Sequence, residues 1–262
     1  MTNFTQSARA KFLVSAVALL GLAACGGGGG GGGSGTGSEI SVSGTTARGA
    51  ALANATVDMT CANGARVTST SDANGAFVSS RVALTYPCIG TAKTSTLTYR
   101  GILFGGNISN FTPLTDLLVE TVLAASASGS AGLTLDQFIA KIRSDSTFAA
   151  NVSSSTTVAA YRASVLKVVK DQLVGSGLTS AQADAIIAAA GNFDSTSFAI
   201  GSPLDKVLDN TASVLQNADG SLKAAILAIA KAAGDLLPTP GSGGTGGTGG
   251  TGGTGGTGGT GG

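Results

Sequence analysis

The chain has 262 residues, a net charge of +1, only 11% charged residues, and neither histidine nor tryptophan. Without histidine, catalytic arrangements of the serine–histidine–aspartate and cysteine–histidine types are excluded, as are zinc sites that depend on histidine. The charge balance also gives no sign of the basic patch that a nucleic-acid partner requires.

The first 24 residues have the layout of a secretory signal peptide. Arg9 and Lys11 form a positive start, and an apolar run from Phe12 to Leu22 follows. A membrane-spanning helix needs roughly 20 apolar residues, and the glycines at 26–33 cannot extend a helix. A cleaved signal is therefore predicted instead of a transmembrane anchor.

The signal ends in Leu22-Ala23-Ala24-Cys25, which resembles a bacterial lipobox. The resemblance implies cleavage before Cys25, lipidation of its thiol and new amino group, and a lipid-anchored protein of the cell envelope. Loss of Arg9 and Lys11 with the signal would leave a net charge of −1. An aspartate after the lipidated cysteine tends to retain such proteins in the inner membrane. Gly26 stands there, so the resemblance favours the outer membrane.

Glycine-rich segments flank the part of the chain that can fold. Residues 25–38 are predicted to be a flexible tether reaching about 20 Å. Residues 239–262 carry Gly-Gly-Thr repeats and are predicted to stay disordered, as a spacer, a surface tail or a product of repeat slippage. The intervening residues, about 200, suffice for one large domain or two small ones.

Once Cys25 is assigned to the lipid, Cys61 and Cys88 are left as a pair. In an oxidising compartment such a pair predicts a disulfide, worth about 3–4 kcal/mol. The two cysteines do not form the C-x-x-C motif of redox proteins, which argues against a redox role.

Residues 39–111 are predicted to form short strands, because apolar side chains alternate with polar ones around 40–42, 55–61, 67–70, 77–84 and 97–104. Ala62-Asn63-Gly64 and Asp72-Ala73-Asn74-Gly75 are predicted hairpin turns. Asp72–Gly75 and the similar 217–220 segment lack the remaining ligands of an EF-hand, so no metal site is predicted. Strands at this spacing suggest a small antiparallel β-sandwich.

Two stretches of this region, 44–57 and 70–77, carry the elements Gly-x-x-Leu-x-x-Ala-x-Val and Thr-Ser-Asp-x-x-Gly-x-Phe. They resemble the carboxypeptidase regulatory-like module. The resemblance implies a transthyretin-like β-sandwich that accompanies other domains and is not itself catalytic. Ser71, Pro87 and Cys88 depart from the pattern of that module.

From residue 112 to 238, apolar residues recur at helical spacing, and about six helices are predicted. Thr112 with Pro113 and Thr134 mark helix starts, and Thr179 with Gln182 fits a capping box. Further helices are predicted at 156–174, 203–215 and 222–236. The predicted fold class is therefore α+β and multi-domain, with a sandwich at 39–111 followed by an α-helical domain at 112–238.

Asn-x-Thr-Pro-Leu-Thr at 110–115 and the segments 193–198 and 205–209 resemble a group of beta-proteobacterial envelope lipoproteins that carry this sandwich. Asp205 and Asp209 lie one helical turn apart, where a solvated acidic face is favoured over a metal or acid–base site. Lys167, Lys170 and Asp171 are predicted surface charges.

These features predict a non-enzymatic envelope lipoprotein that acts as a membrane-tethered binding or scaffold module. Its expected partners are the membrane, through lipidated Cys25, and an unidentified envelope protein or glycan, with no nucleic acid, metal or cofactor. The alternative is a carbohydrate- or peptide-binding accessory lipoprotein. A glycoside hydrolase is disfavoured because Glu39 and Glu120 are the only glutamates in the chain.

Overall fold

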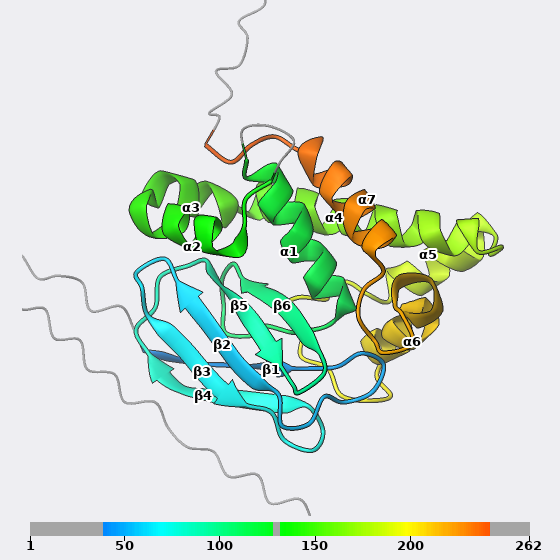
Figure 1. Ribbon diagram of the computed structural model, residues 1–262, viewed down its shortest axis with the longest axis horizontal. Coiled ribbons are helices and arrows are strands. Elements are labelled where there is room, and N and C mark those ends of the chain that lie inside the picture. Colours follow the sequence, from blue (N-terminus) through cyan, green and yellow to red (C-terminus); the bar gives the residue numbers. More distant parts are fainter. Residues whose placement is uncertain (1–38, 128–131, 242–262) are drawn as a thin grey trace, which may run out of the picture. The chain divides into compact units, whose positions relative to one another are not determined.

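In a computed structural model, residues 39–127 and 132–241 are described. Within them the chain forms six strands and then seven helices (Figure 1). The strands are β1 Ile40–Thr45, β2 Thr56–Cys61, β3 Arg66–Thr70, β4 Ala76–Val82, β5 Cys88–Lys93 and β6 Thr98–Leu103. The helices are α1 Pro113–Ala125, α2 Leu135–Ser144, α3 Ser146–Val152, α4 Ser155–Gly175, α5 Ser180–Ala188, α6 Pro203–Leu215 and α7 Ala224–Asp235.

The strands form two antiparallel sheets. One sheet has four strands in the order β3-β2-β5-β6, and the other pairs β1 with β4. The turn at Asn63 and Gly64 joins β2 to β3 as a hairpin, and Gly64 has the positive φ of +83° that such a turn requires. The mixed composition of strands and helices is confirmed.

Side chains from both sheets contribute to one apolar cluster. Val42 and Phe77 come from the two-stranded sheet, and Val57, Met59 and Tyr99 come from alternate positions of the four-stranded sheet. All five side chains are buried. Each projects from the face of its sheet that is turned toward the other sheet, because alternate residues of a strand share one face. The predicted alternation thus identifies this core correctly.

The opposite face of the four-stranded sheet is covered by helices at one end. Ile89 of β5 and Ile102 of β6 point away from the first cluster and belong to a second one, which includes apolar residues of α1, α2, α3 and α4. Helix α1 packs on β6 (Figure 1), and every residue of it except Glu120 is buried. Strands and helices therefore share a core, while their division into two domains stays a prediction.

Local capping defines the helix starts as predicted. The side chain of Thr112 accepts a hydrogen bond from the backbone N–H of Thr115, and Pro113 occupies the first turn of α1. Thr134 and Thr179 cap α2 and α5 in the same way, each in a capping box with a glutamine. These short-range interactions are readable from the sequence.

Two expectations for this part of the chain are wrong. The turn at Asp72–Gly75 does not close a hairpin, because β3 pairs with β2 whereas β4 pairs with β1, so the turn carries the chain from one sheet to the other. The sequence pattern also misses α3, which begins directly after α2. Asp145 separates the two helices and caps α3 by accepting the N–H of Phe148 at 2.8 Å.

The predicted signal peptide, tether and most of the tail lie outside the described residues. None of the helices in the described part of the chain combines the length and apolarity needed to cross a bilayer.

Candidate functional site

The disulfide predicted from the cysteine count is present. Cys61 and Cys88 are bonded at the ends of β2 and β5, where the register places them directly opposite each other. Both side chains are fully buried. The third cysteine, Cys25, is the predicted lipidation site and lies outside the described residues.

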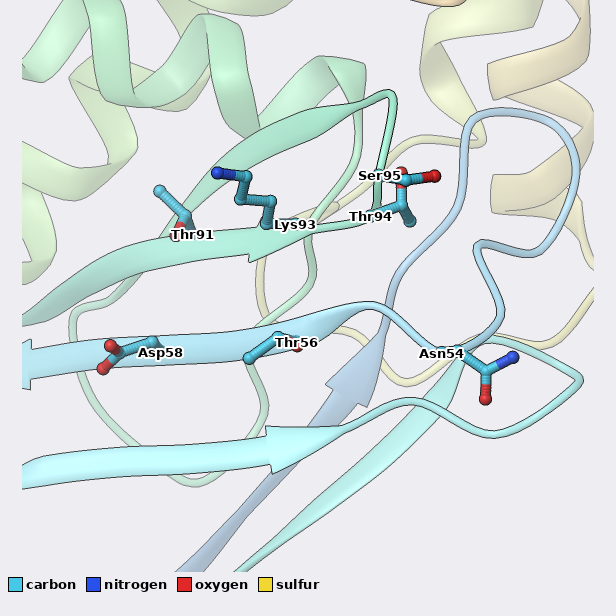
Figure 2. Close-up of a pocket in the computed structure, with 7 residues that line it drawn as sticks. All are labelled: Asn54, Thr56, Asp58, Thr91, Lys93, Thr94 and Ser95. Atoms are coloured by element: carbon cyan, nitrogen blue, oxygen red, sulfur yellow. The ribbon is translucent and has the colours of Figure 1, made fainter.

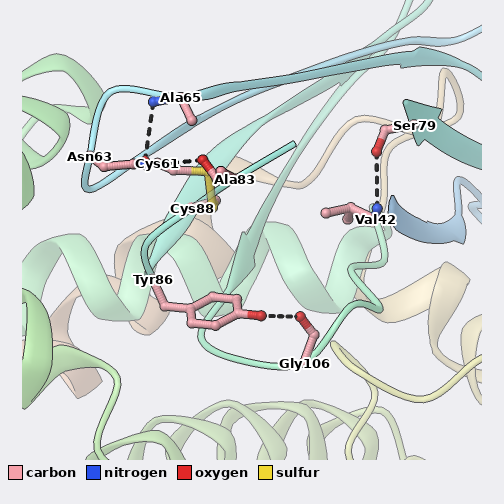
Figure 3. The surroundings of a disulfide bond; sticks show 9 residues. All are labelled: Val42, Cys61, Asn63, Ala65, Ser79, Ala83, Tyr86, Cys88 and Gly106. Carbon is pink, nitrogen blue, oxygen red and sulfur yellow. Dashed lines mark hydrogen bonds between the residues drawn. A yellow bond between two sulfur atoms is a disulfide. The ribbon is translucent and has the colours of Figure 1, made fainter. Parts of the chain in front are cut away.

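Hydrogen bonds hold the loops around this disulfide (Figure 3). The side-chain amide of Asn63 donates to the carbonyl of Ala83 at 3.0 Å, and the hydroxyl of Tyr86 donates to the carbonyl of Gly106 at 2.5 Å. The buried, hydrogen-bonded setting assigns the bond a structural role, because no sulfur is open to an exchanging thiol.

A hollow of about 480 Å³ lies on the exposed face of the four-stranded sheet (Figure 2). We call it the strand groove. All of its lining residues have polar side chains, and they come from β2, from β5 and from the loops next to them: Asn54, Thr56, Asp58, Thr91, Lys93, Thr94 and Ser95. Its volume is in the range of small-molecule sites, although a pocket lining is normally more apolar.

The pairing register places the side chains of the strand groove. Thr56 lies opposite Lys93, and Asp58 lies opposite Thr91. These four residues alternate along their strands with the buried Val57 and Ala92. All four therefore project from the sheet face opposite the apolar cluster to which both sheets contribute. They form two cross-strand rows on one surface.

The strand groove is open because the helices stop at a boundary on this face. Arg100 of β6 marks it: its guanidinium pairs with Asp116 and, at 2.9 Å, with Glu120, both on α1. On one side of Arg100 the face carries Ile102 and is covered by helices. On the other side it carries Thr98 and is exposed.

One charge in the strand groove has no counter-charge. Asp58 pairs with Arg66 of the neighbouring strand β3. Among the described residues Lys93 forms no ion pair, and the hydroxyls of Thr56 and Thr91 have no hydrogen-bond partner. The surface therefore presents one unpaired ammonium group beside free hydroxyls.

Two of the three segments on which the second predicted resemblance rests, 110–115 and 193–198, come together elsewhere, around the buried side chain of Asn110. Its amide donates to the carbonyls of Phe193 at 2.9 Å and Thr196 at 2.8 Å, and its Oδ1 accepts the backbone N–H of Thr45 at 3.0 Å. Arg162 of α4 then pairs with Asp194 in the same segment. These contacts join β1 and α4 to the segments that precede α1 and follow α5, so both segments have a structural role here.

Asp205 and Asp209 do not form the solvated acidic face that their spacing predicts. Asp205 is only 2% exposed and accepts the backbone N–H of Gly201 at 2.7 Å, at the start of α6. It occupies the first turn, where a carboxylate offsets the unpaired N–H groups and the helix dipole. Asp209 alone is exposed.

The other charged residues singled out from the sequence lie on the surface, as predicted. Lys167 pairs with Asp171 at 2.7 Å, and Lys170 pairs with Asp184 at 2.6 Å. In residues 39–127 and 132–241, no group of three acidic or cysteine side chains is arranged to hold a metal ion.

No family model matches the chain, and no curated protein or solved structure shows a significant match either.

Sequence reasoning did not identify the strand groove. Its signal was the polar half of the alternation, with threonine, aspartate and lysine at every second position of 56–58 and 91–93. Polar residues at these positions are common on any strand with one solvent-exposed face, so the pattern alone does not indicate a site. The groove is recognised only in the tertiary structure, where helices cover one part of the face and leave the other part open.

Proposed function

We propose that the chain is a non-enzymatic lipoprotein of the bacterial envelope whose folded part is a membrane-tethered binding or scaffold module. The observation that carries this proposal is the strand groove, an open surface of polar side chains on a sheet face that helices cover at one end only. A lipobox-like Leu22–Cys25 and a glycine-rich segment precede the folded part, so the groove would be displayed near a membrane.

The carboxypeptidase regulatory-like β-sandwich is part of this proposal. It is supported by the two antiparallel sheets and by the apolar cluster to which both contribute. Modules of that kind bind or support and do not catalyse, and a chain without histidine lacks the commonest acid–base group.

Anchoring is tested by comparing the wild-type chain with Cys25→Ser. We expect the wild type in the membrane fraction with acyl chains attached, and the variant without them and released from the membrane. Equal membrane retention of both forms, with no acyl group on the wild type, would contradict the lipoprotein assignment.

Binding is tested by crosslinking the tagged chain in cells and identifying what co-purifies from the envelope. A partner captured by the wild type but not by Cys25→Ser would support a tethered module. Capture of the same material by both forms would show that tethering is irrelevant to binding.

The second candidate is a carbohydrate- or peptide-binding accessory lipoprotein. The hydroxyl, amide and charged side chains of the strand groove favour it, because these groups form hydrogen bonds with extended polar ligands. It differs from a scaffold in its ligand, which would be a saccharide or peptide and not a folded protein.

A further inference from the structure

The strand groove combines hydrogen-bonding groups with a single unpaired cation. We propose that it binds a glycan bearing a carboxylate group, with Lys93 pairing with that carboxylate and Thr56 and Thr91 contacting neighbouring hydroxyls. This inference rests on the proposed binding function and names the chemical class of its ligand.

The composition of the groove selects for a hydroxyl-rich ligand. None of its seven lining residues is aromatic, so a sugar would be held by hydrogen bonds and not by stacking. The hydroxyls of Thr56 and Thr91 can each donate and accept, and within the described chain neither has a partner to displace. A ligand with many hydroxyl groups can bind without aromatic stacking and can both donate hydrogen bonds to these threonines and accept hydrogen bonds from them.

The charge of the groove selects for an anion. Arg66 pairs with Oδ2 of Asp58, whereas Oδ1 of Asp58 is buried without a hydrogen-bond partner among the described residues. Lys93 is therefore the one charged side chain lining the groove that forms no ion pair within that part of the chain. The ammonium group of lysine has three donors and attracts a carboxylate more strongly than a neutral hydroxyl. A neutral sugar would leave this charge unpaired.

The spacing of the strands allows one linear ligand to contact several side chains of the strand groove at the same time. Thr56 and Lys93 face each other across β2 and β5, and Asp58 and Thr91 form the next row. Neighbouring strands are about 4.8 Å apart, and alternate residues along one strand are about 6.8 Å apart. A linear saccharide lying on the sheet can therefore contact both rows with its carboxylate at Lys93.

The test uses the full chain and two trisaccharides, tri-galacturonic acid and its carboxyl-reduced neutral counterpart. Calorimetric titration at low ionic strength should show binding of the acid at least about tenfold tighter than that of the neutral sugar. We expect Lys93→Gln to weaken binding of the acid to the level of the neutral sugar. Thr91→Val should weaken binding of both sugars.

Lys206→Gln is the matched control, since Lys206 is an exposed lysine of α6 that also lacks an ion pair among the described residues. It should leave both affinities unchanged. Equal binding of the two sugars, no binding of either, or an unaltered affinity in Lys93→Gln would overturn the inference.

A peptide ligand is a separate outcome. If N-acetyl-alanyl-alanine, with its free carboxylate, binds in a Lys93-dependent way while tri-galacturonic acid does not, the glycan assignment is wrong. Membrane fractionation and envelope crosslinking test the proposed function without either sugar, so failure of the glycan inference is distinguishable from failure of the tethered module.

Discussion

Arg162 and Asp194 form a two-point ion pair, in which Nε and Nη2 of the arginine each lie 2.7 Å from a different carboxylate oxygen. Asp194 is only 2% exposed, and Nη1 of the same arginine donates to Asn192 at 3.1 Å. The pair fixes the segment after α5 to the side of α4, although the two residues are far apart in the sequence.

Removing one partner of this pair should be costly. Asp194→Asn leaves the Arg162 guanidinium without its counter-charge, and we expect a loss of about 3 kcal/mol in the free energy of unfolding. Urea denaturation followed by circular dichroism measures it. The control is Asp171→Asn in the exposed Lys167–Asp171 pair, where the loss should stay below about 1 kcal/mol. Equal losses in both variants would contradict the prediction.

The buried side chain of Asn110 should be as important as the ion pair. Asn110→Ala leaves the N–H of Thr45 and the carbonyls of Phe193 and Thr196 without these hydrogen bonds. Thr196 is exposed, whereas Thr45 and Phe193 are buried. Each unsatisfied buried group costs about 1–3 kcal/mol, so we expect a loss of at least about 2 kcal/mol by the same denaturation measurement. Asn210→Ala on the exposed side of α6 should change stability by no more than about 0.5 kcal/mol.

The disulfide should stabilise the fold through the 27-residue separation that it closes. On the chain-entropy model this contribution is about 3.5 kcal/mol. The double variant Cys61→Ala/Cys88→Ala should lose about this amount, and reductant should then have no further effect on it. A double variant as stable as the oxidised wild type would show that the bond contributes nothing.

Alkaline pH should destabilise the protein through two buried tyrosines. Burial raises the pKa of Tyr99 and of Tyr161 well above the usual value of 10.0. Above pH 10 the unfolded chain therefore loses protons that the folded chain keeps, and stability falls as the pH rises. Tyrosinate absorbance and circular dichroism should change together with unfolding. Ionisation of all three tyrosines near pH 10 with the fold intact would contradict this prediction.

Local chemistry was sufficient for most of the secondary structure. Thr112 with Pro113, and Thr179 with Gln182, mark helix starts because a side chain and its backbone partner lie within three residues of each other. The strands follow from alternation for the same reason: side chains on successive residues point to opposite faces. The sequence also predicts that Cys61 pairs with Cys88, by reserving Cys25 for the proposed lipid anchor, and the disulfide between these two residues is confirmed.

Only the tertiary structure decided which surfaces are open and which local patterns serve packing. Asp205 has the spacing of a surface carboxylate but is buried at a helix start, and Asn110 meets Phe193 across 83 residues of sequence. Ile102 and Thr98 occupy the same face of β6, yet α1 covers one and leaves the other exposed. The strand groove is open because the helices cover only part of this sheet face. Which part they cover depends on how helices distant in the sequence pack on the sheet, and no short-range sequence pattern encodes that packing.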